Sequence, residues 1–174
     1  MAAILFILNA LLTLVVVAFL LRALMPLVRA DFRNPLGQAV LQFTDPLVRP
    51  LRRVLGPVGR VDIASIAAVL LVQFAGTALL RLVAGAGFSI AVTLVTALKM
   101  LAQTVLSLYS VAILAYVVLS WIAPGTHSPA TRLLDALCEP LLRPFRRIIP
   151  PIAGLDLAPV FVLICLQALQ IPLR

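Results

Sequence analysis

Charged and chemically reactive side chains are scarce in this sequence of 174 residues. Only 11% of the residues are charged, and the single histidine, His127, lies in the loop sequence PGTHSP. The sequence contains no Ser-His-Asp set, no metal-ligand cluster and no phosphate-cradling glycine loop. All six carboxylates lie in or beside two arginine-rich loops, which argues against a proton relay inside a membrane. We therefore expect a protein that is not an enzyme and that carries no metal or cofactor.

Cysteines and aromatic residues are also few. Cys138 lies in an arginine-rich loop and Cys165 inside an apolar run, without the C-x-x-C spacing of a metal or redox site. The formal net charge is +8, yet the chain has one tryptophan and no aromatic stacking array. Because the arginines are grouped in loops between apolar segments, the expected partner is anionic phospholipid and not nucleic acid.

Apolar residues are abundant: they make up 63% of the chain and give a mean hydropathy of +1.17. A soluble domain of this size has too little interior to bury them. The apolar runs predict an all-α membrane protein with four transmembrane helices, since a span needs about 20 apolar residues. The spans are expected at about 3–28, 63–84, 100–122 and 157–171. The fourth ends before Pro172 and must be short, tilted or surrounded by a thinned bilayer.

The N-terminal apolar run and residues 85–99 each allow two interpretations. The N-terminal run has no basic region and exceeds the ~7–15 apolar residues of a signal-peptide core, so we expect a retained first transmembrane helix. Residues 85–99 are interpreted as an interfacial linker, or else as a protruding end of the third span. Fused to that span, residues 88–99 would give a helix much longer than a bilayer requires.

An internal repeat organises the chain. The segment DPLVRPLRRVLGPVGRVDIAS begins at Asp45, and EPLLRPFRRIIPPIAGLDLAP begins at Glu139, 94 residues later. The same shift aligns Asn9 with Gln103, Thr13 with Ser107, Pro35 with Pro129, Arg49 with Arg143, Asp62 with Asp156, and Gln73 with Gln167. We infer two tandem units, residues 1–94 and 95–174, each made of a helix, an amphipathic loop and a second helix.

The repeat predicts a topology. An even number of crossings separates the two arginine loops, so both lie on one side of the membrane, cytoplasmic by the positive-inside rule. Both termini then face the outer side. Because the two units run in the same direction, their pseudo-symmetry axis is expected along the membrane normal.

The cationic loops are predicted to form bent amphipathic platforms. In the second loop, PATRLLDALCEP has the apolar spacing of an interfacial helix, and the Asp45-Pro46 and Glu139-Pro140 pairs resemble fresh helix starts. A bend is expected at each Arg-Pro dipeptide, and Asp62 and Asp156 are predicted to cap the following helices. The candidate lipid- or partner-binding residues are Arg49, Arg52, Arg53, Arg143, Arg146 and Arg147. A purely topogenic role for these arginines remains an alternative.

Polar side chains also occur within the predicted spans. They are Asn9, Thr13, Gln73, Gln103, Ser107 and Gln167. These residues either line a hydrated path between the units or hydrogen-bond between helices, and the second interpretation is favoured.

The segments Ser120 to Gln167 and Asp31 to Ser65 resemble the two repeats of the YggT family of bacterial membrane proteins and its chloroplast relatives. The pattern E/DPLxRPxRRxxPPxxGxD carries the resemblance, although Gly56 and Arg60 replace Pro150 and Gly154 in the first copy. The resemblance implies a multi-pass protein of the bacterial inner (plasma) membrane. Members of the family have been linked with osmotic and potassium tolerance, with cell division or nucleoid placement, and in plastids with haem attachment to a cytochrome.

These features predict a membrane scaffold or assembly factor of the cell envelope, acting in division, stress tolerance or membrane-complex biogenesis. Its two cationic loops would face anionic phospholipid or a membrane-protein partner, and a homo-oligomer is also expected. The alternative is a small ion-conducting component of osmotic-stress or potassium transport that uses the intramembrane amides.

Overall fold

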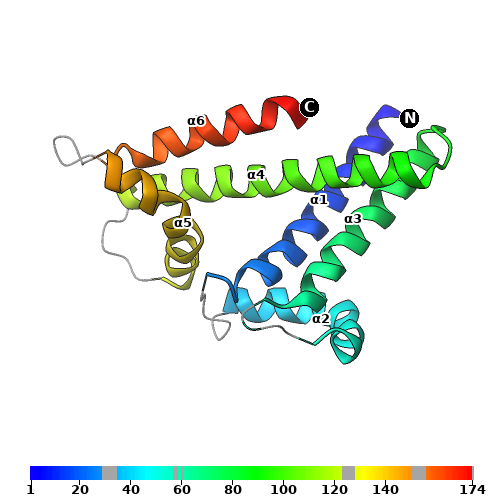
Figure 1. Cartoon of the computed structure of the whole chain (residues 1–174), viewed down its shortest axis with the longest axis horizontal. Coiled ribbons are helices and arrows are strands. Elements are labelled where there is room, and N and C mark those ends of the chain that lie inside the picture. Colours follow the sequence, from blue (N-terminus) through cyan, green and yellow to red (C-terminus); the bar gives the residue numbers. More distant parts are fainter. Residues whose placement is uncertain (29–34, 57–58, 60, 123–127, 150–155, 174) are drawn as a thin grey trace.

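The computed structural model describes residues 1–28, 35–56, 59, 61–122, 128–149 and 156–173. All secondary-structure elements assigned within these residues are helices, which confirms the predicted all-α class. In chain order the helices are α1 (Ala2–Leu24), α2 (Pro35–Val54), α3 (Ile63–Val83), α4 (Ile90–Ile122), α5 (Pro129–Ile148), α6 (Ala158–Gln170) and the 3₁₀ helix η1 (Ile171–Leu173) (Figure 1).

Among the described residues, three helices are long and apolar enough to cross a membrane: α1, α3 and α4. The predicted fourth span corresponds to α6, which has only 13 residues. At 1.5 Å per residue this helix is about 20 Å long, whereas a hydrocarbon core is about 30 Å thick. The structure therefore supports three membrane-length helices and a shorter apolar one.

The third predicted span begins about ten residues before residue 100, in agreement with the interpretation of residues 85–99 as a protruding helix end. Helix α4 runs without interruption from Ile90 and has 33 residues, so most of the predicted linker is helix. The turn before it contains Gly85 and Gly87 at φ +70° and +66°, a conformation that side chains other than glycine rarely adopt. Residues 90–99 contain neither glycine nor proline, so nothing in their sequence interrupts the helix.

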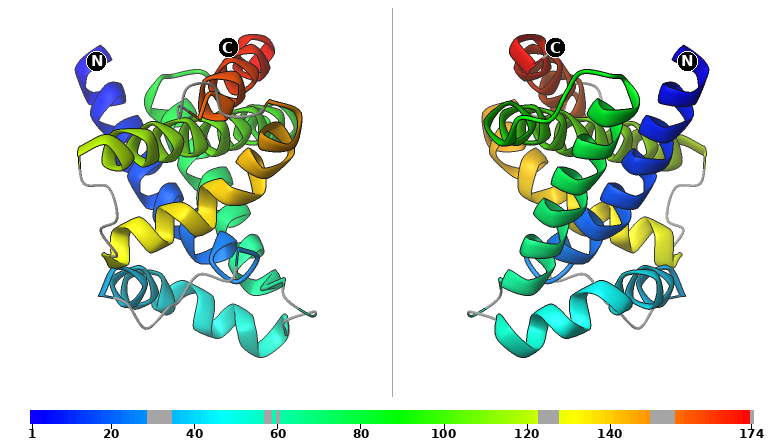
Figure 2. Two further views of the ribbon diagram at one scale, coloured as in Figure 1. Left: turned by 90° about the vertical axis from the view of Figure 1, so that its left-hand side faces the viewer. Right: turned by 90° about the vertical axis from the view of Figure 1, so that its right-hand side faces the viewer.

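The two cationic segments form α2 and α5, each 20 residues long, and their bounds differ by the repeat shift of 94 at both ends. The expectation of a fresh helix start inside each segment is wrong, because each helix continues through its two internal prolines. These are Pro46 and Pro50 in α2, and Pro140 and Pro144 in α5. An internal proline removes a backbone donor and bends a helix, and α2 changes direction along its length (Figures 1 and 2).

Two hydrophobic clusters hold the helices together. The first joins α1, α2 and α3 and consists of Val16, Phe19, Leu20, Ala23, Val48, Ala64, Ala68 and Val69. The second joins α4, α5 and α6 and consists of Ala112, Ile113, Cys138, Leu142, Ala158, Val162 and Leu166. Each half of the chain therefore has a core of its own, in which the amphipathic helix packs against a pair of apolar helices.

The long helix α4 connects the halves. It packs against α1 and α3 as well as α5 and α6, and it lies across the α1–α3 pair at an angle (Figures 1 and 2). The pairs α1–α3 and α4–α6 are therefore inclined to one another (Figure 1). Both amphipathic helices lie on the same side of α4 and contact each other (Figure 1).

Candidate functional site

One arginine of α2 fixes that helix to the next. The guanidinium of Arg52 forms an ion pair with Asp62, which is the N-cap residue of α3. Asp62 also accepts hydrogen bonds from the backbone N–H of Ser65 at 3.3 Å and from its hydroxyl at 2.7 Å. The carboxylate thus satisfies a backbone donor of α3 and anchors the end of α2 at the same time.

The second half uses the equivalent residues. Arg146 Nε donates to Asp156 Oδ2 at 2.7 Å, and Asp156 Oδ1 accepts from the N–H of Ala158 at the start of α6 at 3.0 Å. Arg146 also pairs with Glu139 at 2.7 Å and donates to the Tyr116 hydroxyl at 3.1 Å. This arginine therefore ties α5 to both α4 and α6.

A residue that sequence reasoning missed is Arg22, near the end of α1. It is only 2% exposed and donates to Thr44 Oγ1 at 2.8 Å and to Asp45 Oδ1 at 2.7 Å, both on α2. A buried charge needs a partner, so a lone arginine within an apolar run was the available signal. The repeat shift maps Arg22 onto Tyr116, and both residues bind the amphipathic helix of their own half.

These contacts change the titration of the carboxylates. Burial opposes ionisation of Asp45, but hydrogen bonds and positive charge from Arg22 and Arg49 outweigh it and lower the pKa. Burial likewise disfavours the charged form of Asp62, while hydrogen bonds from Ser65 and Arg52 leave its pKa below the ordinary value. Both groups are therefore ionised at neutral pH.

The thiol of Cys138 is buried in the second hydrophobic cluster. Burial and the nearby charge of Asp135 raise its pKa to about 12. Since the thiolate is the reactive form, this cysteine is a packing residue. No group of three or more potential metal ligands occurs in the described part of the chain, and His127 lies outside that part.

The six arginines singled out from the sequence fall into two groups. Arg52 and Arg146 are held in the ion pairs above. Arg49 is 77% exposed, with an (i, i+4) pair to Asp45. The other three have exposed side chains and no carboxylate partner within the described residues; they are Arg53, Arg143 and Arg147.

Each half also has an exposed apolar residue beside one of these arginines. Val54, at the end of α2, is 84% exposed, and Ile148, at the end of α5, is 79% exposed. The two positions are equivalent under the repeat shift of 94 and directly follow Arg53 and Arg147. A guanidinium next to a protruding apolar side chain is suited to the boundary between headgroups and acyl chains.

The intramembrane polar residues do not meet in one path within the chain. Gln73 is buried and donates to Thr77 Oγ1 at 3.1 Å. Thr13 donates to the carbonyl of Asn9 at 2.8 Å, and Gln103 donates to the carbonyl of Leu173 at 2.7 Å. Ser107 and Gln167 instead line an open groove of about 660 Å³ between α4 and α6. The amides Gln73 and Gln167 therefore lie in different environments.

Membrane-length apolar helices, together with two amphipathic cationic helices, define a class of helical membrane proteins. The chain belongs to the CCB3/YggT family, whose model matches residues 1–83 and 95–174, which confirms the resemblance seen in the sequence. It is 37% identical over 170 residues to an uncharacterized protein of Pseudomonas aeruginosa, covering 97% of this chain and 86% of that one.

Two further relatives extend the comparison. The chain is 31% identical over 165 residues to "Uncharacterized protein YggT" of Escherichia coli, covering 95% of this chain and 86% of the relative. It is 36% identical over 63 residues to "YlmG homolog protein 2, chloroplastic" of Arabidopsis thaliana, covering 36% of this chain and 25% of the relative. No solved structure matches the chain.

Proposed function

We propose that the protein is a non-enzymatic membrane scaffold or assembly factor of the cell envelope, and that it presents α2 and α5 to anionic phospholipid or to an acidic surface of a membrane-protein partner. The observation that carries the proposal is the division of the arginines. One arginine in each half fixes the amphipathic helix in place, while others remain exposed on it.

The exposed group has the chemistry of an interfacial contact. A basic residue near an anionic membrane surface contributes about 1 kcal/mol, so several on two adjoining helices give substantial attraction. Val54 and Ile148 add an exposed apolar side chain at the end of each of these helices. Since α2 and α5 lie on one side of α4, a single membrane face is able to contact both, and the positive-inside rule assigns it to the cytoplasm (Figure 1).

The test compares two groups of arginine variants. In Arg53→Gln/Arg143→Gln/Arg147→Gln the three exposed charges without a carboxylate partner are lost, whereas the anchoring ion pairs remain. We expect this variant to insert normally and to retain fewer phosphatidylglycerol molecules than wild type, counted by native mass spectrometry. Retention of phosphatidylcholine should stay unchanged. Lys99→Gln, an exposed change on α4, serves as a control for loss of positive charge elsewhere.

Purification in mild detergent distinguishes a protein client from lipid. A stoichiometric protein that accompanies wild type and is lost from the triple variant would identify the client of an assembly factor. Equal lipid retention and equal protein recovery for wild type and the triple variant would contradict the proposal.

The transport alternative has one supporting observation, the polar groove lined by Ser107, Ser110 and Gln167. In a single chain this groove is open along the side of α4 and α6, so a conducting path would have to form between several copies. Ion flux in proteoliposomes that is lost on Gln167→Leu would favour transport over the scaffold role.

A further inference from the structure

Helix α4 covers the groove between α1 and α3. Leu101, Val105 and Leu108 of α4 pack against the first hydrophobic cluster, and Thr77 Oγ1 of α3 lies 3.8 Å from Met100 Sδ. The residues of the covered groove are buried; they include Val16, Gln73 and Thr77. An apolar stripe of a following helix thus closes the helix pair of the first half.

The second half has the equivalent groove but nothing closes it. The repeat shift maps Val16, Gln73 and Thr77 onto Ser110, Gln167 and Ile171. These three residues line the open groove of about 660 Å³ between α4 and α6. Gln167 and Ile171 are exposed, in contrast to their buried counterparts in the first half.

The apolar stripe of α4 that covers the first groove also has an exposed equivalent in the repeat. Shifting Leu101, Val105 and Leu108 back by 94 residues gives three residues on one face of α1. They are Ile7, Leu11 and Leu14, and each is more than half exposed. Helices α1 and α6 are not among the packed pairs of described helices, so the chain does not close this contact on itself.

We propose that the groove between α4 and α6 is occupied by α1 of a second copy of this chain, seated as α4 is seated on α1 and α3. The two chains exchange this contact reciprocally, which gives a closed two-fold dimer. Both termini lie on the upper side of the molecule in Figures 1 and 2, so the start of α1 can meet the end of α6 of a second copy without inverting either chain. This dimer is independent of the interfacial role proposed above.

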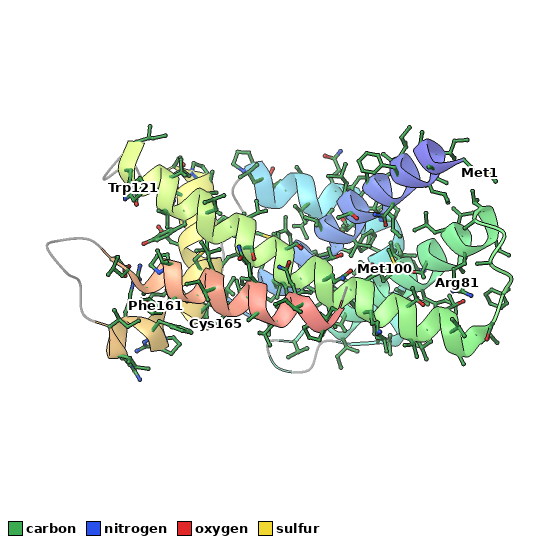
Figure 3. All side chains as sticks on the ribbon, turned by 90° about the horizontal axis from the view of Figure 1, so that it is seen from above. Met1, Arg81, Met100, Trp121, Phe161 and Cys165 are labelled. Carbon is green, nitrogen blue, oxygen red and sulfur yellow. The ribbon has the colours of Figure 1, made fainter. Side chains whose placement is uncertain are left out.

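The lining of the groove is partly polar, unlike a surface adapted to acyl chains. Gln167 has no hydrogen-bond partner among the described residues, and Ser107 and Gln170 lie beside it in the same lining. Acyl chains offer no hydrogen bonds, and unsatisfied polar groups are costly in hydrocarbon. A second helix both excludes lipid from these groups and supplies the apolar stripe that fills the space. Figure 3 shows α6, which includes the labelled Phe161 and Cys165, lying along α4.

Disulfide formation between differently tagged copies tests the proposal. The Thr77–Met100 contact maps onto Ile171 and Phe6, so one copy carries Phe6→Cys and the other Ile171→Cys, both with Cys138→Ser and Cys165→Ser. We expect mild oxidation in native membranes to link the two tags. Replacing Phe6→Cys by Leu8→Cys, which lies about 160° around α1 from Phe6, should abolish the link.

The mass of the wild-type protein provides a second readout that needs no substitution. Two copies per complex in mild detergent and a link between the two tags support the dimer. A single copy per complex, or a Phe6→Cys/Ile171→Cys double variant that forms its disulfide only within one chain, would overturn it. Equal linking of the Phe6→Cys and Leu8→Cys copies would also overturn it, since random collision then explains the product.

Discussion

Arg146 Nε lies 2.7 Å from Asp156 Oδ2, and the same pair occurs 94 residues earlier as Arg52 and Asp62. In both halves the arginine belongs to the end of an amphipathic helix, and the aspartate lies at the start of the apolar helix that follows. This pair ties the end of the amphipathic helix to the start of the apolar helix that follows. On the same two helices Arg53, Arg143 and Arg147 are exposed and form no such pair within the described residues.

The first prediction concerns the anchoring arginine of the second half. Arg146→Gln removes ion pairs to Glu139 and Asp156 and a bond to Tyr116. Bonds to charged groups contribute about 1.5–3 kcal/mol when shielded, and because these pairs are about one-third exposed we expect a loss of about 1–2 kcal/mol. Thermal unfolding in detergent, monitored by circular dichroism, measures this loss of stability relative to wild type.

Arg147→Gln is the matched control for that change, because Arg147 is the exposed neighbour of Arg146. An exposed substitution of this kind should alter stability by less than about 0.5 kcal/mol. Equal shifts for the two variants would show that the ion pairs of Arg146 do not hold α5 in place.

The second prediction concerns Arg22. Arg22→Leu leaves Asp45 without its buried partner and removes the bond to Thr44, so the first part of α2 should detach from α1. We expect faster amide hydrogen exchange in α2 and a destabilisation of about 2–3 kcal/mol. Arg49→Leu removes only an exposed (i, i+4) pair and should cost less than about 0.5 kcal/mol. Unchanged exchange in α2 of Arg22→Leu would contradict this role.

The third prediction is a dependence of stability on pH. The folded-state pKa of Asp62 is depressed, so its contribution is fully present above the ordinary value of 3.8 and disappears as the pH falls through the lower folded value. The melting temperature of wild type should therefore decrease when the pH is lowered below about 4. Asp62→Asn, which keeps an N-cap side chain but loses the ion pair, should melt lower at neutral pH and show a smaller acid-induced drop. Parallel curves for the two proteins would contradict the assignment.

The fourth prediction concerns the two thiols. Cys138 is buried and its pKa is raised to about 12, so a maleimide should not modify it until the protein unfolds. Cys165 is exposed on α6 and should react with a membrane-permeant reagent in the folded protein. Mass spectrometry of the labelled peptides distinguishes the two sites, and rapid labelling of Cys138 in folded protein would show that α5 is not packed as described.

Much of the fold could be predicted because the repeat and the apolar runs reflect local sequence. The proline and arginine spacing identified α2 and α5 as equivalent elements, and the apolar composition predicted the helical class. For residues 85–99 the sequence left two interpretations open. The structure supports a protruding helix end from Ile90, since neither glycine nor proline interrupts residues 90–99. The α6 span was predicted to be short and to end before Pro172, and the observed helix Ala158–Gln170 has nearly the predicted bounds.

The site was less predictable because it depends on which charges meet in space. The sequence presents Arg52 and Arg53 as one dipeptide, yet successive helical residues point in different directions, so one is paired and the other exposed. Arg22 was missed because its partners, Thr44 and Asp45, lie more than twenty residues away. Likewise, the equivalent residues Gln73 and Gln167 differ in burial only because α4 covers one of them.

The most direct test of the interfacial account is the depth of Val54 and Ile148 in a bilayer. A nitroxide spin label is placed at each position, with Cys138→Ser and Cys165→Ser, in nanodiscs that contain phosphatidylglycerol. The account predicts that both labels collide more readily with membrane-dissolved oxygen than with a water-soluble nickel reagent, and that both lie at the same leaflet. Labels fully accessible to the nickel reagent, or lying at opposite leaflets, would contradict it.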